Sequence, residues 1–128
     1  MTVLMICLFL ALLLPYLAKM PLAYAMQKQG RYDNHHPREQ QSKLTGFGAR
    51  ALAGHQNAFE SAIIFTPAIL LAISTRHNSH TIQYLAIAHI IARVIYHLLY
   101  LFDKSSFRSI VWGIGVSCAF AILAFCII

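Results

Sequence analysis

The sequence predicts an all-α integral membrane protein, folded as a four-helix bundle. Its 128 residues are 59% hydrophobic and only 11% charged, whereas soluble domains carry about 25% charged residues. The apolar residues gather in four long runs, each close to the ~20 residues that cross the hydrocarbon core of a bilayer. A chain of this length leaves room for one domain, so residues 1–128 are expected to form a single transmembrane domain.

The first helix is expected at residues 3–26, although Pro15, Lys19 and Pro21 interrupt its apolar run. Its amino end lacks the basic region that opens a signal peptide, so we expect a retained transmembrane helix. The polar stretch 27–44 follows as a loop and holds most of the loop charge.

The second helix is expected at residues 47–74, where the first half is polar on one side and the second half is apolar. Pro67 is expected to kink it. The third and fourth helices are expected at 80–102 and 107–128, each after a short polar turn. With four spans, both termini lie on one side of the membrane.

The basic residues predict the orientation of the bundle. Six of them lie in or beside the first and third loops: Lys28, Arg31, Arg38, Lys43, Lys104 and Arg108. The second loop holds only Arg76, so the positive-inside rule places loops one and three in the cytoplasm and both termini outside it. The net charge of +6 comes without a basic stripe bearing exposed aromatics, so no nucleic-acid partner is expected.

A polar run opens the second helix, from Arg50 to Glu60. Residues three, four and seven apart share a helix face, which places Arg50, Asn57 and Glu60 on one stripe. An unpaired charge at Glu60 would cost several kcal/mol in an apolar surrounding. Ionisable groups inside a membrane span mark a functional site by default.

A second polar stripe lies on the third helix, where Arg93, Tyr96, His97 and Tyr100 share a face. Arg93 is the only arginine well inside another span, so we expect it to pair with Glu60 between the two helices. Two interpretations stay open, since this pair can be structural or can contact a ligand directly.

Arginine gathers at the cytoplasmic edge, at Arg31, Arg38, Arg50 and Arg108. Its forked side chain binds carboxylates with two hydrogen bonds, which favours a small anion with several carboxylates. The alternative is ordinary anchoring to lipid head groups. Tyr100 and Ser109 can each donate a hydrogen bond to a thiolate. The alternative for Tyr100 is an aromatic residue of the membrane interface, and the alternative for Ser109 is a hydroxyl that bonds the backbone.

Other chemistry finds little support in the sequence. All three cysteines lie in apolar runs, and no carboxylate or thiol completes a ligand set with the loop histidines, so no metal site is expected. Arrangements for a serine or cysteine nucleophile are also missing. Any reaction would therefore depend on positioning and stabilising an anion.

Three motifs resemble those of one known family. The run Arg50-Ala-x-x-Gly-His-Gln-Asn-x-x-Glu60 is similar to the signature of the MAPEG family, the membrane-associated proteins in eicosanoid and glutathione metabolism. Arg93-Val-x-Tyr-x-x-x-Tyr100-Leu and Phe107-Arg-Ser109 match its third helix and the start of its fourth. The second-helix run and the sequence of the first loop together resemble the bacterial branch of the family.

The resemblance implies a homotrimer in the bacterial inner membrane, with glutathione bound between neighbouring subunits near the cytoplasm. A lipophilic co-substrate would enter from the lipid bilayer. Carried over by position, the residues that line or support the glutathione site are Arg31, Asn57, Glu60, Arg93 and Tyr100. Arg50, the nearest arginine on the stripe of Asn57, and Tyr96, where some members have histidine, are added as candidates. Arg108, with Ser109 beside it, would stabilise the glutathione thiolate.

The leading hypothesis is a glutathione-dependent transferase or peroxidase that acts on lipophilic electrophiles. The chain departs from glutathione-using members at Ala53 and Gln56. This departure motivates an alternative, a non-catalytic binding protein for another small anion or a lipid. A third hypothesis is a proton-coupled transporter with His55, Glu60 and His89 as a relay.

Overall fold

The computed structural model describes residues 1–127 and is all-helical over that range. Its helices are α1 (Thr2–Gly30), α2 (Pro37–Ser42), α3 (Gly46–Ser74), α4 (His80–Leu101) and α5 (Ser105–Ile127). All four predicted spans are present, in the predicted order. The last residue of the fourth predicted helix, Ile128, lies outside the described residues.

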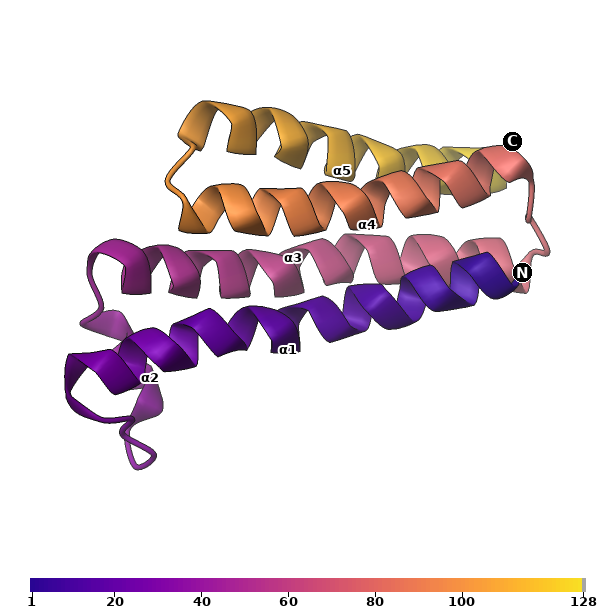
Figure 1. Ribbon diagram of the computed structural model, residues 1–128. Coiled ribbons are helices and arrows are strands. Elements are labelled where there is room, and N and C mark those ends of the chain that lie inside the picture. The colour runs from indigo at the N-terminus through magenta and orange to yellow at the C-terminus, as the bar shows by residue number, and fades with distance from the viewer. Residues whose placement is uncertain (128) are drawn as a thin grey trace.

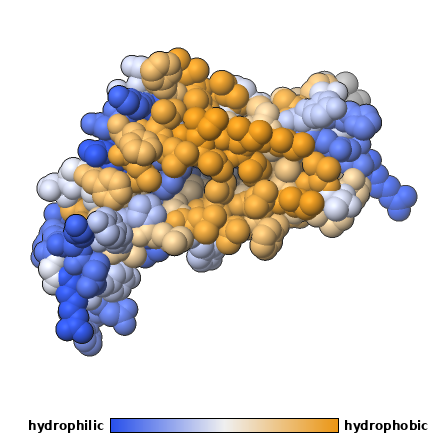
Figure 2. Space-filling model, viewed as in Figure 1, coloured by the Kyte–Doolittle hydropathy of each residue, from blue (hydrophilic) through white to orange (hydrophobic). Residues whose placement is uncertain are grey.

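The four long helices lie side by side, with α1 packed on α3 and α4 packed on α5 (Figure 1). Each is long and apolar enough to cross a membrane. An apolar belt covers the middle of the face shown in Figure 2, and hydrophilic residues gather at the two ends. The described chain begins and ends at the same end of the bundle, as four spans require. We call the opposite end, with the α1–α3 and α4–α5 connections, the loop end.

The largest differences from the sequence prediction lie at the end of the first helix and in the first loop. The first helix continues four residues past the predicted end at Met26 and stops at Gly30, since polar residues can extend a helix beyond its apolar run. Gly30 and Arg31 then adopt positive φ angles of 146° and 87°, which turn the chain. The short helix α2 was missed, because the stretch was interpreted as loop. Pro37 at its first turn suits a helix start.

Side-chain hydrogen bonds order the segment between α1 and α3. The Asp33 carboxylate accepts the backbone N–H groups of His35 at 2.9 Å and His36 at 3.0 Å. The Gln40 side chain donates to the carbonyls of Met26 at 3.1 Å and Arg31 at 2.9 Å. These bonds attach α2 to the end of α1.

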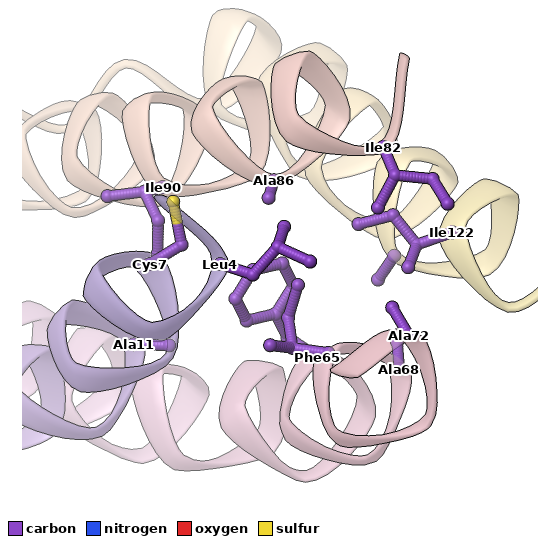
Figure 3. Packing of buried hydrophobic residues seen from close by; sticks show 12 residues of the cluster. Leu4, Cys7, Ala11, Phe65, Ala68, Ala72, Ile82, Ala86, Ile90 and Ile122 are labelled. Atoms are coloured by element: carbon purple, nitrogen blue, oxygen red, sulfur yellow. The ribbon is translucent and has the colours of Figure 1, made fainter. Parts of the chain in front are cut away.

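The larger apolar core lies in the half of the bundle away from the loop end, and a smaller cluster of Leu22, Met26 and Ala51 lies toward the loop end. In the larger core, Phe65 of α3 is fully buried beside Leu4 of α1, and Ile82 of α4 lies beside Ile122 of α5 (Figure 3). Alanines complete this core: Ala11, Ala68, Ala72, Ala86 and Ala119. Small residues let membrane helices approach closely, so this half is filled by side chains of all four long helices.

Candidate functional site

A chain of three polar side chains links α3 and α4. Arg93, which is 6% exposed, donates a hydrogen bond to Asn57 Oδ1. Asn57 Nδ2 in turn donates to Glu60 Oε2 at 2.8 Å. The predicted direct pairing of Glu60 with Arg93 is therefore wrong, since no ion pair joins them within residues 1–127. Asn57 lies between them because an amide can accept from one partner while it donates to another.

Two arginines stack on two tyrosines beside this chain. The Arg93 guanidinium lies 4.2 Å from the centre of the Tyr96 ring, and that of Arg108 lies 4.0 Å from the Tyr100 ring. The two tyrosine rings meet edge to face, with 5.6 Å between their centres. Such stacking stabilises a cation by about 0.5–2 kcal/mol, depending on its hydration. The tyrosines of α4 thus connect the arginine of α4 with that of α5.

The other predicted site residues make fewer contacts with these side chains. Arg50 Nε donates to the carbonyl of Leu101 at 3.4 Å, at the end of α4. The Ser109 hydroxyl donates to the carbonyl of Ser105 at 3.2 Å, which is the backbone bonding considered as its alternative role. Arg31 lies in the exposed connection after α1, where its carbonyl accepts from Gln40. The structure brings Asn57, Glu60, Arg93, Tyr96, Tyr100 and Arg108 together, with Arg50 at the rim.

Glu60 is exposed on the surface of this single chain. It lies 14 residues after the start of the 29-residue helix α3, which is about 21 Å along its axis. The carboxylate is therefore near the middle of a membrane-spanning helix. A charge facing lipid at this depth is costly, so the exposed position of Glu60 is unusual for a residue whose only neighbour would be hydrocarbon.

Two histidines absent from the predicted site set, the buried His89 and the partly buried His97, lie on the same face of α4 as Arg93. His89 Nδ1–H donates to the Gly115 carbonyl at 2.8 Å, so its Nε2 accepts from the Ser61 hydroxyl at 3.2 Å. Its ring also stacks on Phe65, with 4.0 Å between centres. The spacing of His89, Arg93 and His97 at four-residue steps is the signal that identifies them on one face of α4.

The described contacts do not form a relay through His55, Glu60 and His89. His55 Nδ1 donates to the carbonyl of Pro15 at 2.9 Å, while Glu60 accepts from Asn57. His89 bonds Ser61 and Gly115. Over residues 1–127, no three His, Cys, Asp or Glu side chains come close enough to hold a metal ion. The site combines two arginines, two tyrosines, one amide and the Glu60 carboxylate, and its arginines are suited to holding an anion.

Comparison with known proteins gives one match. The family model of the MAPEG family matches residues 3–128, which is essentially the whole chain and includes every residue of the site. No curated protein and no solved structure matches the chain.

Proposed function

Because this chain belongs to the MAPEG family, we propose that it is a glutathione-dependent transferase or peroxidase acting on lipophilic electrophiles within the membrane. The family match confirms the resemblance inferred from the motifs. Family membership supports a role in glutathione-related transfer or in eicosanoid metabolism in a membrane. The polar site between α3, α4 and α5 supports the more specific proposal of a glutathione-dependent transferase or peroxidase.

The observation that carries the proposal is the placement of Arg108. Its guanidinium rests on the Tyr100 ring and is half-buried, and no side-chain hydrogen bond to it is formed within residues 1–127. Its N–H groups thus remain able to donate to a bound anion. A cation beside a thiol lowers the thiol pKa and raises the population of the nucleophilic thiolate.

In the proposed reaction, the glutathione thiol loses its proton to water, and the thiolate sulfur accepts hydrogen bonds from Arg108. The thiolate then attacks an electrophilic carbon, and the leaving group departs with the bonding electrons and takes up a proton from water. With a peroxide, the thiolate attacks one oxygen, the other leaves as an alcohol after protonation, and a second glutathione converts the resulting sulfenic acid to the disulfide and water. Arg50 and Arg93, with Arg31 from the loop, would bind the glutathione carboxylates. Glu60 accepts a hydrogen bond from Asn57 through one carboxylate oxygen, and it would accept another from the ammonium group of glutathione.

The proposal includes a homotrimer. Glu60 is exposed near the middle of α3, and a neighbouring subunit would cover it and complete the site. The loop end, which carries most of the basic loop residues, would face the cytoplasm of a bacterial cell. Cross-linking in native membranes tests the trimer directly, and a monomer band alone would contradict it.

Glutathione binding and turnover test the function. Calorimetry on the protein purified in detergent is expected to show binding at millimolar glutathione. The Arg108→Ala variant is expected to retain most of this binding and to lose about 10²–10³-fold in the rate of transfer, the usual effect of removing a donor from a developing anion.

Arg76→Asn is the matched control, because it removes an arginine at the opposite end of the bundle. Asparagine tolerates the positive φ of 59° found at Arg76. Transfer by this variant is expected to equal that of the wild-type protein. Absence of glutathione binding by the wild-type protein would overturn the proposal. It would favour a binding protein for another small anion or a lipid, as Ala53 and Gln56 suggest.

A further inference from the structure

A pocket of about 400 Å³ lies between α1, α3 and α4. This volume is in the range of small-molecule sites, about 300–1,000 Å³. Its wall is mostly apolar and includes Leu14, Leu17, Met20, Ala58, Ala62 and Leu98. Asn57 and Glu60 do not line it, so it lies beside the polar site, with Arg93 and Tyr96 forming part of the wall between the two.

The pocket is long and lies parallel to the helices. Its α4 wall extends from His89 to Leu101, 12 residues or about 18 Å at the helical rise. Its mouth includes Leu17, Met20 and Leu98, whose side chains are 48%, 67% and 47% exposed. These residues belong to apolar membrane spans. The pocket therefore opens sideways toward hydrocarbon, and its shape suits a single extended chain.

One end of the pocket offers an unpaired polar atom. His97 Nε2 is buried and has no hydrogen-bond partner within residues 1–127. The ring lies against Gly54, where an added Cβ would come within 2.8 Å of His97 Nδ1. His97 is four residues from Leu101, about 6 Å from the end of α4 at the loop end. Deeper in the pocket, Ser61 and His89 already bond each other.

We propose that this pocket binds one acyl chain of a bilayer phospholipid, whose ester carbonyl accepts a hydrogen bond from His97 Nε2. Ester groups lie just inside the head groups, at the depth where His97 stands near the end of its span. The chain would extend from there toward Ala11 and Ala62. An empty apolar slot loses dispersion contacts along its whole lining, and a lipid chain restores them. The proposal does not depend on glutathione.

Photolabelling in nanodiscs tests for the chain. The probe is a phospholipid with a diazirine in its acyl chain, and the readout is residue-level mass spectrometry. Ala18 and Gly54 line the pocket and are buried, so only a chain inside it reaches them. Ala58→Phe, which fills the pocket, is expected to reduce their labelling to background. Ala124→Phe makes the same change on the exposed face of α5 and is expected to leave it unchanged.

A second variant tests the same prediction in case Ala58→Phe does not fold. Val94 lines the pocket and is 42% exposed, so Val94→Phe narrows the mouth without entering the core. It is expected to lower the labelling of Ala18 as well, with an unfolding temperature close to that of the wild-type protein. Equal labelling of Ala18 in Ala58→Phe, Val94→Phe and the Ala124→Phe control would overturn the proposal.

A matched pair of lipids tests the role of His97. A diether probe lacks the ester carbonyl, and its labelling of Ala18 in the wild-type protein is expected to be roughly fivefold weaker than that of the diester probe, the factor given by one net hydrogen bond. His97→Leu removes the donor and is expected to abolish this difference. Equal labelling by the two probes in the wild-type protein would overturn the proposed hydrogen bond.

Discussion

The two halves of the bundle differ in how completely one chain fills them. Away from the loop end, Phe65 is fully buried by side chains from all four long helices. Toward the loop end, Arg93 is buried but Glu60 is exposed and Arg108 is half-buried. The first half is packed by side chains of this one chain. In the second half, charged side chains remain accessible, which is typical of a site rather than of a core.

The largest expected effect is in the apolar half. Phe65→Ala leaves a cavity among Leu4, Ile82 and Ile122, and is expected to lower the free energy of unfolding by about 3–5 kcal/mol. Phe9→Ala is the control, because Phe9 is 63% exposed. Thermal unfolding of both variants in detergent measures the difference. Equal losses would mean that the apolar half is not the independent core described above.

A smaller loss is expected from the polar half. Arg93→Met removes the donor to Asn57 Oδ1 and leaves a part-buried amide oxygen unsatisfied, which is expected to cost about 1–3 kcal/mol in unfolding free energy. Methionine keeps the apolar stem, so the change reports on the loss of the guanidinium, with its hydrogen bond to Asn57 and its stacking on Tyr96. Chemical unfolding in mixed micelles provides the measurement. A variant as stable as the wild-type protein would show that this half gains nothing from its polar chain.

Glu60→Gln separates the bridged arrangement from a direct ion pair. Glutamine can still accept from Asn57 Nδ2 at the position of Oε2, so the loss of unfolding free energy is expected to stay below about 1 kcal/mol. With a direct pair, Glu60→Gln and Arg93→Met would lose similar amounts. Chemical unfolding of the two single variants measures both losses, and equal losses would contradict the bridge through Asn57.

The smallest expected effect lies outside both halves, in the connection before α2. The backbone N–H of His36 donates to Asp33 and holds its pKa below the ordinary value of 3.8. Desolvation acts in the opposite direction, and the N–H of His35 lowers the pKa further. The depressed pKa means that ionised Asp33 orders this turn above pH 3.8, and that the contribution is lost as pH falls through the lowered pKa.

Hydrogen exchange at the amides of His35 and His36 measures this loss. Protection in the wild-type protein is expected to fall toward that of Asp33→Asn as the pH is lowered, while protection in the core half stays constant. A constant difference between the two proteins at every pH would contradict the assignment to the Asp33 carboxylate.

The predicted helices and the real ones agree where hydropathy changes sharply. The third predicted helix, at residues 80–102, differs from α4 (His80–Leu101) by one residue. The prediction failed where helix continues into polar sequence, as at Gly30, and where six polar residues form α2. Pro37 at the start of α2 was a local signal for it, but a short helix held by Gln40 depends on contacts with the end of α1.

The sequence by itself determined the four spans, their order, the family and the polar faces of the second and third predicted helices, because these depend on residue type and on the fixed periodicity of a helix. Only the tertiary structure decided that Asn57 stands between Glu60 and Arg93. It also decided that Arg108 lies on Tyr100, and that a pocket opens beside His97. Such partners depend on how far one helix is shifted and rotated against the next, and a displacement of 2–3 Å exchanges one hydrogen-bond partner for another.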